Sequence, residues 1–590
     1  MRTAHLLQAN EWQPPSQRRT VVSLRLLANL LMMEQPDEVL HGALCLSRSG
    51  ALQPLVAMTE RLDTMDRKRQ ALKAYASHVS KLCPKDWTAN ELHVELCNST
   101  SPLTSKKVDL NRPCTGSETQ FCHIYDELSL WNEVLCHCHM QIKEVAPKEL
   151  AISAFHGRRL EPGTAAKARY ALVLVHWLLK EHHCLRALRI QGSVILENSE
   201  LLCDALRLAV GLKSLEIWGK HIIRKFDQPH QLVVEAMTAN QTLQSLHITD
   251  EWSWFGHKNF PDIIKNNSGL LELALEGPIS EKVQSFTEAI RVNKTMQKLS
   301  LNWSGVSVCD TKEFCSALAK NLSLQMVIMS NVDEKLVEEL LAQFLASTKT
   351  LKCATLSFPT TESSTQSLLD GLLCNKSISK LELGYWCFKD RHAEDFAQVL
   401  RWNNTLTHLT LHHMSSLSIL QELAKCIADN KFLLCINFDK MRFFTGKPWM
   451  VRIMDTLRRN LSLLQCAVYF VVGNHFKRCG EAFEQLFRSQ TLLEKVQEFD
   501  SESESVAKER ILNSKRHLDI NFLAVAGVVK STVACSRGNG SQVKLDEVGV
   551  DNWLLVRSYL KLTDIKNAPD EPCPPPSKRQ KLDRACKRKL

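Results

Sequence analysis

Seven cysteine and histidine side chains lie close together in the sequence, and thiolates and imidazoles are the ligands that zinc prefers. They are Cys114, Cys122, His123, Cys136, His137, Cys138 and His139. Zinc ligands commonly come in pairs with about two to four residues between them. Successive cysteines here are 8, 14 and 2 positions apart. Because this spacing forms no two such pairs, we predict ordinary buried or solvated side chains and no metal site. The shorter group His182, His183 and Cys184 is a weaker signal still.

Patterns for catalysis or cofactor binding do not stand out elsewhere in the sequence. The nearest candidate for a phosphate-binding loop, Thr445 to Pro448, lacks the upstream glycine and the Ser or Thr that would reach a metal. No H-E-x-x-H motif and no evident Ser/His/Asp set is found. We therefore predict that the protein is not an enzyme and holds no cofactor.

The elements that would position any functional residue are set by a repeat. Between about residues 175 and 470, a 16-residue pattern recurs eleven times, for example at Phe396 to Leu411. Its first half spaces apolar residues as on one face of a helix, and its second half alternates as in a short strand. A fixed period of roughly 20–50 residues is typical of a solenoid.

The predicted strands follow one another at intervals of 26 to 31 residues, enough for one strand, one helix and two turns. They end at Ile190, Ile217, Ile248, Leu275, Leu301, Met329, Leu356, Leu383, Leu411, Phe438 and Val468. This pattern resembles the leucine-rich-repeat superfamily in its helical, ribonuclease-inhibitor-like class, and the repeats of intracellular NLR-like proteins. The resemblance implies an α/β solenoid, a horseshoe of about 11 helix–strand repeats with helical flanking regions. The nucleotide-binding domain that precedes the repeats of NLR receptors has no counterpart here.

An asparagine recurs at one register, after the helical half of eight copies. These residues are Asn240, Asn267, Asn293, Asn321, Asn375, Asn403, Asn430 and Asn460. Asn can close a helix in the left-handed conformation and can bond nearby backbone. Six of the eight also read N-x-S/T, the acceptor motif of a glycosylated ectodomain. Periodicity explains all eight positions, so we favour a structural role for them.

Composition and charge narrow the class of protein. A hydrophobic content of 44% suits a folded, soluble chain. The first 20 residues have no apolar core of signal-peptide type, and no apolar run approaches the roughly 18–20 residues that span a bilayer. We therefore expect an intracellular protein without a membrane segment, whose 21 cysteines are reduced. Of the net charge of +10, +6 lies in the last 13 residues, so no specific nucleic-acid ligand is expected.

The predicted organisation has four parts. Residues 1–150 are a mainly helical N-terminal region or cap, and whether they form a death-fold or adaptor domain stays open. Residues 151–470 are the repeat array. Residues 471–565 are a helical C-terminal cap, with an acidic Ser-rich linker near 498–505 that is a plain linker or a phosphorylation site. Residues 566–590 are a disordered, Pro-rich basic tail.

Aromatic and histidine side chains at or just beyond the strands are the predicted partner-binding residues. They are Trp218, Trp252, Trp254, Trp303, Tyr385, Trp386, His408 and His412. Trp and Tyr dominate interface hot spots, although each can instead pack on its own loop. Exposed strand residues beside them carry both charges, which predicts no polyanionic ligand.

The basic tail is typical of a nuclear localisation signal. Its cationic residues are Lys578, Arg579, Lys581, Lys587, Arg588 and Lys589. An extended basic segment can place successive side chains in acidic pockets of an import receptor, or can bind RNA or acidic surfaces without specificity. The prediction is a nuclear or cytoplasmic protein with a possible import receptor at its tail.

Together these features predict a non-catalytic protein–protein recognition scaffold that uses its concave face and aromatic rim. Two alternatives stay open. Repeats of similar length occur in activators of the Ran GTPase, although those usually carry an acidic segment where this chain is basic. A ubiquitin-ligase substrate receptor is the other, although no convincing F-box or SOCS-type motif is present.

Overall fold

The computed structural model describes most of the chain beyond residue 111. It describes residues 67, 70–82, 88, 90, 92, 112–117, 120–154, 165–219, 227–249, 259–278, 283–303, 306–330, 334–357, 362–384, 389, 391–412, 417–438, 447–529 and 549–566. Within these described residues, twelve strands form one sheet in sequence order, β1 to β12. The chain divides into two compact units, residues 1–271 and 272–590. In the described residues no helix has the length and apolar character needed to cross a membrane.

In the first unit an antiparallel hairpin precedes the helix–strand repeats, and helical residues 70–82 come before the hairpin. Its strands are β1 (Met140–Ala146), β2 (Glu149–Ala154), β3 (Leu185–Gln191), β4 (Ser214–Trp218) and β5 (Ser245–Ile248). Its helices are η1 (His123–Tyr125), α6 (Leu128–Leu135), η2 (Cys136–Cys138), α7 (Ala165–Glu181), α8 (Gly192–Glu197), α9 (Ser199–Leu208), α10 (Asp227–Ala239) and α11 (Pro261–Asn266). β1 pairs antiparallel with β2, and β2 to β5 pair in parallel.

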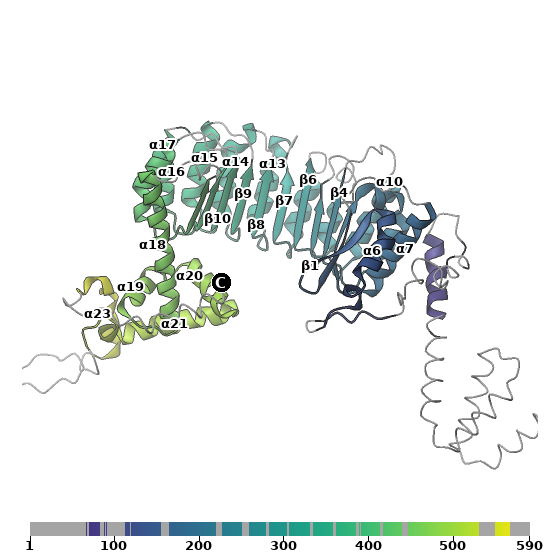
Figure 1. The fold of residues 1–590 in the computed structure, drawn as a ribbon. Coiled ribbons are helices and arrows are strands. Elements are labelled where there is room, and N and C mark those ends of the chain that lie inside the picture. The colour runs from purple at the N-terminus through teal and green to yellow at the C-terminus, as the bar shows by residue number, and fades with distance from the viewer. Residues whose placement is uncertain are drawn as a thin grey trace, which may run out of the picture. The chain divides into compact units, whose positions relative to one another are not determined.

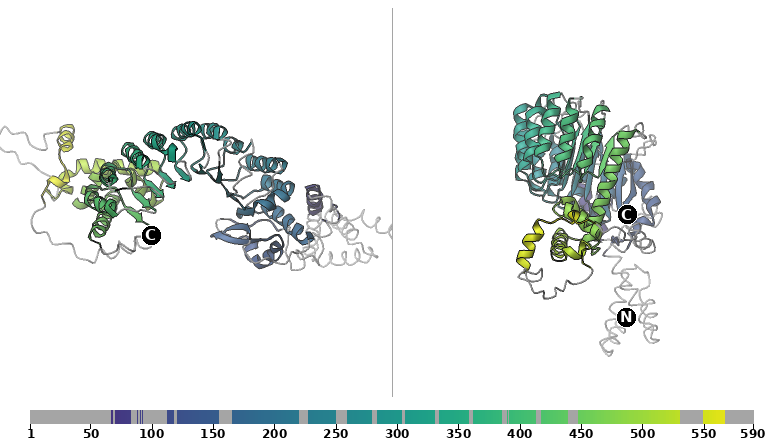
Figure 2. Two further views of the ribbon diagram at one scale, coloured as in Figure 1. Left: turned by 90° about the horizontal axis from the view of Figure 1, so that it is seen from above. Right: turned by 90° about the vertical axis from the view of Figure 1, so that its left-hand side faces the viewer.

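The second unit continues the repeats and ends in a helical bundle. Its strands are β6 (Glu272–Pro278), β7 (Lys298–Asn302), β8 (Met326–Ser330), β9 (Cys353–Ser357), β10 (Lys380–Gly384), β11 (His408–Leu411) and β12 (Cys435–Phe438), all parallel. The repeat helices are α12 (Val283–Val292), α13 (Val308–Lys320), α14 (Glu334–Ser347), α15 (Glu362–Cys374), α16 (His392–Trp402), α17 (Leu417–Cys426) and η4 (Ile427–Asp429). Figures 1 and 2 show α13 to α16 on one side of the strands that they connect.

Ten of the eleven predicted strands are present, and nine of them end at or next to the predicted residue. β6 continues to Pro278, three residues beyond the predicted end at Leu275. The eleventh predicted strand, at Val468, lies inside α18 (Pro448–Val471), a continuous helix of 24 residues. Asn460 likewise lies in the middle of α18 and not at a helix end. The prediction was wrong there because the apolar side chains of 464–470 fit a helical face as well as a strand. Leu464, Ala467, Val468 and Phe470 are all buried in the C-terminal core.

The C-terminal cap is a bundle with its own core. It contains α18, α19 (Lys477–Leu486), α20 (Gln490–Asp500), α21 (Glu504–Ile520), α22 (Phe522–Val525), α23 (Val550–Ser558) and η6 (Leu562–Asp564). The predicted linker at 498–505 is instead the end of α20, a short turn and the start of α21. α21 ends at Ile520, and Phe522–Val525 follow as the short helix α22.

The recurring asparagines connect one repeat to the next. Asn321 donates from Nδ2 to the carbonyls of Ile290 and Asn293, each at 2.9 Å. Its Oδ1 accepts the backbone N–H groups of Ser323 and Leu324. All eight asparagines are at most 7% exposed. These buried amides confirm the structural interpretation, because a committed and buried Nδ2 cannot take a glycan in the folded chain.

Their backbone conformation differs from the expectation. The asparagines that end α11, α13, α16 and η4 have φ between -71° and -87° with extended ψ, and are not left-handed. Asn is therefore used here for its side chain, which satisfies backbone groups on both sides of the turn.

Candidate functional site

One face of the strands carries the side chains that helices do not cover. In β8, Val327 and Met329 are buried against the helices, whereas Met326, Ile328 and Ser330 are only partly buried. The same alternation holds in β7 and β9, because successive side chains of a strand point to opposite faces. This open face is the surface on which the repeats could meet a partner.

Parallel register arranges the open-face side chains in rows across the strands of the second unit. The first row is Lys298, Met326, Cys353, Lys380, His408 and Cys435. The second row is Ser300, Ile328, Thr355, Glu382, Thr410 and Asn437. Met326 and Ile328 therefore form an apolar centre on β8, with charged residues on either side of it.

Ion pairs on this face join neighbouring strands. Lys298 lies 3.6 Å from Glu272, and His412 Nε2 lies 2.7 Å from Glu382 Oε1. Thr355 donates to the other oxygen of Glu382 at 3.3 Å. These side chains are about a third to a half exposed, so the pairs contribute little to stability. They give the open face groups of both charges, and it has no large area of a single charge sign along these pairs.

Helix α20 of the terminal bundle borders the same face. Glu494 accepts a hydrogen bond from Lys352, the residue before β9, at 3.3 Å. The pKa of His408 is lowered, first by burial and then by Lys380, while Glu494 and Glu498 oppose the shift. The open face is thus bounded beside β9 to β11 by an acidic helix.

The structure separates the predicted aromatic rim into different environments. Trp218 is half-buried at the end of β4, beside Gln191 of β3. Trp303 is 1% exposed and packs edge-to-face on Phe314, with ring centroids 4.9 Å apart. It is a core residue and offers no surface to a partner. His408 and His412 are half-buried on the open face, and their role in partner binding stays a prediction. Trp252, Trp254, Tyr385 and Trp386 lie outside the described residues.

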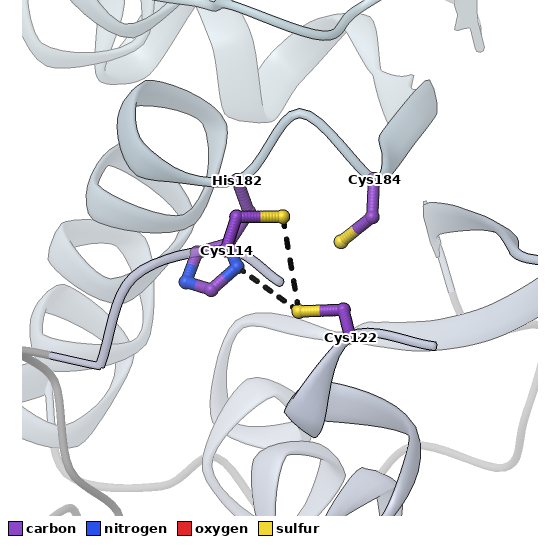
Figure 3. A group of neighbouring side chains, drawn as sticks. All are labelled: Cys114, Cys122, His182 and Cys184. Carbon is purple, nitrogen blue, oxygen red and sulfur yellow. Dashed lines mark hydrogen bonds between the residues drawn. The ribbon is translucent and has the colours of Figure 1, made fainter. Parts of the chain in front are cut away.

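The Cys/His group of the sequence is also divided. Cys136 to His139 form η2 and its cap, where burial raises the pKa of Cys138 to about 12. Cys114 and Cys122 instead lie beside His182 and Cys184, which come much later in the sequence (Figure 3). Sequence reasoning missed this grouping because it compared only near neighbours. The available signal was the His-x-Cys pair at the predicted end of the first repeat helix.

Three thiols in this cluster share hydrogen bonds, which spread their pKa values. The hydrogen bonds with Cys122 and with Cys184 lower the pKa of Cys114. The pKa of Cys122 falls to about 7, where the bond to Cys114 raises it and those to Cys184 and His182 lower it. Bonds to Cys114 and Cys122 raise the pKa of Cys184.

The residues predicted for nuclear import lie outside the described residues. They are Lys578, Arg579, Lys581, Lys587, Arg588 and Lys589.

Comparison with solved structures finds proteins similar to this chain, and two of them are described below. No family model matches the chain, and no curated protein sequence matches it. A structure titled Leiomodin-1 Actin-Binding Site 2 is 18% identical, with a TM-score of 0.21, over 30% of this chain and 87% of that one. The tropomodulin C-terminal domain of Caenorhabditis elegans is 11% identical, with a TM-score of 0.22, over 31% and 95%. From its own sheet order and repeat helices, the chain is an α/β solenoid of the leucine-rich-repeat type with helical flanks.

Proposed function

We propose that the protein is a non-catalytic recognition scaffold that binds a folded protein through the open face of β7 to β10. The observation that supports this most directly is the apolar centre of Met326 and Ile328, half-buried on strands whose other face is packed on helices. Lys298 lies beside it on β7, and Lys380 and Glu382 lie two strands away on β10. A partner would present an apolar protrusion surrounded by charges of both signs.

The mechanism is rigid display. Buried asparagines and parallel hydrogen bonds hold each strand to its neighbours, so the open-face side chains lose little freedom on binding. A well-packed apolar contact at the centre of such an interface contributes about 2 kcal/mol or more. The flanking ion pairs would select the partner and its orientation more than they would tighten binding.

The test is affinity purification of the full-length protein from its native cells beside a variant with Met326→Asp and Ile328→Asp. Leu322→Asp is the matched control, because Leu322 is 79% exposed and belongs to the same repeat. A stoichiometric partner that the control retains and the double variant loses, with equal circular dichroism spectra, supports the proposal. Equal recovery by both variants would move the binding site off this face.

Nuclear import through the C-terminal tail belongs to the same proposal. The basic residues at 578–589 carry most of the excess positive charge of the chain. A fluorescent fusion of the full chain should enter the nucleus, and Ala substitutions at Lys578, Arg579 and Lys581 should shift it to the cytoplasm. Unchanged distribution of the substituted fusion would remove import from the proposed function.

A further inference from the structure

Four potential metal ligands converge in the first unit from segments separated in sequence. Cys114 and Cys122 lie in the stretch of chain just before η1. His182 and Cys184 flank the turn between α7 and β3. Their ligand atoms all lie within 4.8 Å of one another. His182, Cys122 and Cys184 are buried, and Cys114 is partly buried. Figure 3 shows the three sulfur atoms and the imidazole directed toward a common centre.

Two of the distances between these atoms match the edges of a zinc tetrahedron. Bonds of about 2.3 Å to sulfur and about 2.05 Å to nitrogen place two sulfurs about 3.8 Å apart, and a sulfur and a nitrogen about 3.6 Å apart. The Sγ atoms of Cys114 and Cys122 are 3.8 Å apart, and Cys122 Sγ is 3.5 Å from His182 Nδ1. A disulfide needs sulfurs about 2.05 Å apart, and all three cysteines are free thiols.

The surrounding backbone is arranged as it is around a bound thiolate. The backbone of Gly116 and that of Cys184 lower the pKa of Cys114, and the backbone of Ile124 lowers the pKa of Cys122. A Cβ on Gly116 would stand 3.0 Å from Cys184 Cβ and 3.6 Å from Cys114 Sγ. The loop therefore needs glycine in order to close this tightly on the cluster.

Two neighbouring histidines also approach the sulfurs: His183 Nε2 lies 3.7 Å from Cys114 Sγ, and His123 Nδ1 lies 3.6 Å from Cys122 Sγ. Neither belongs to the group of four whose ligand atoms all lie within 4.8 Å of one another. His183 Nε2 lies 2.5 Å from the carbonyl oxygen of Gly116, which fixes the loop that carries Cys114. The His182 ring packs edge-to-face on Trp177 and His123, with centroids 5.0 and 5.2 Å away. Its Nε2 is buried with no hydrogen-bond partner among the described residues, so Nδ1 is the ring nitrogen that faces the sulfurs.

We propose that Cys114, Cys122, His182 and Cys184 form a structural zinc site that fastens the N-terminal segment to the first repeat. Three thiolates and one imidazole are a ligand set of structural zinc, and soft sulfur ligands disfavour Mg²⁺ and Ca²⁺. Four protein ligands leave no open position for substrate. Cys184 also accepts the N–H of Leu150 at β2 through its carbonyl, so the site closes the end of the sheet where a solenoid needs a cap.

The first experiment measures zinc in the full-length protein after gel filtration, by inductively coupled plasma mass spectrometry. About one zinc per chain is expected. The double variant Cys114→Ser/Cys122→Ser should retain less than about a tenth of it. Cys309→Ser/Cys374→Ser is the matched control, because both of those cysteines are exposed, and it should keep the full content.

Cobalt keeps the test decisive if the serine variant fails to fold. Co²⁺ added to the metal-depleted wild-type protein should produce thiolate charge-transfer bands and the visible bands of tetrahedral coordination. His182→Cys should still bind, since four cysteines are also a zinc set, and its visible bands should shift to longer wavelength. His182→Ala should bind at least tenfold more weakly.

A purified protein that contains no zinc and takes up neither metal would overturn the proposal. So would a Cys114–Cys122 disulfide found by peptide mass spectrometry of the non-reduced protein. Cobalt spectra that do not change in His182→Cys would place the metal elsewhere in the chain and would equally reject these four ligands.

Discussion

At the scale of single residues, buried polar side chains join neighbouring repeats by hydrogen bonds. Six of the recurring asparagines donate to a backbone carbonyl of the preceding repeat and accept N–H groups of the turn that follows them. We call these six the asparagine ladder: Asn240, Asn267, Asn321, Asn375, Asn403 and Asn430. An unsatisfied buried group costs more than a typical hydrogen bond contributes. The asparagines therefore stabilise the fold at positions where the N-x-S/T motif alone would suggest glycosylation.

Substitutions at Asn403 and at its neighbour Asn404 compare a buried, hydrogen-bonded asparagine with an exposed one. Asn403 donates to the Leu372 carbonyl at 3.1 Å and accepts from the N–H groups of Thr405 and Leu406. Asn403→Ala should lower the free energy of unfolding by about 1–3 kcal/mol. Asn404→Ala, at an exposed position, should change it by less than about 0.5 kcal/mol. Denaturant titration checks both, and equal effects would contradict the ladder.

His176 makes the first unit sensitive to acid. Its ring is buried, with Nε2 2.9 Å from Asp204 Oδ2 and Nδ1 2.9 Å from the Tyr75 hydroxyl. Burial lowers the pKa of His176, Asp204 opposes this, and His78 and Lys180 add to it. Because the folded pKa lies below the unfolded value of about 6.5, its contribution is complete above that pH and is lost as pH falls.

The thermal midpoint should therefore drop between about pH 7 and pH 5, and the drop should be smaller in His176→Gln. Differential scanning fluorimetry across this range measures both. Parallel curves for wild type and variant would show that other groups, such as the carboxylates, account for the acid sensitivity.

At the scale of elements, the terminal bundle shows how packing overrides local composition. The acidic, serine-rich stretch near 500 has the composition of a linker, yet Val496 is fully buried and keeps α20 helical to Asp500. Ser501 then takes a left-handed conformation, with φ 55°, and α21 begins at Glu504. Phosphorylation of Ser501, Ser503 or Ser505 stays a prediction.

Ser501 provides a pair of substitutions with opposite signs. A left-handed residue other than glycine costs about 1–2 kcal/mol, so Ser501→Gly should stabilise the bundle by up to about 1 kcal/mol. Ser501→Val should destabilise it, because a branched Cβ clashes further in this conformation. Thermal unfolding monitored by circular dichroism distinguishes them, and a stabilising valine would refute the argument from strain.

At the scale of the whole molecule, stability should be local. Each repeat of a solenoid contacts chiefly its neighbours, so damage spreads over few repeats. The core position of Trp303, which replaces its predicted place on the rim, makes it a suitable probe. Its backbone N–H donates to Ser330 of the next strand at 2.9 Å.

Trp303→Ala should increase hydrogen exchange in β6 to β8 and leave β3, β4 and the terminal bundle close to wild type. Leu562→Ala, in the buried core of the bundle, should give the reverse pattern. Exchange measured by mass spectrometry of peptides tests both variants. Uniformly faster exchange along the chain would mean that the protein unfolds as one cooperative unit.

The sequence by itself determined the repeat, since the period places ten strands and the asparagine register without knowledge of any distant contact. It also predicted the histidines of the open face, because alternation along a strand decides which side a residue occupies. Only the tertiary structure decided what depends on packing between distant segments. Examples are Val468 within a long helix, Trp303 in the core, and Cys114 and Cys122 beside His182 and Cys184. Local periodicity is a property of neighbours in the chain, whereas burial and ligand geometry are properties of neighbours in space.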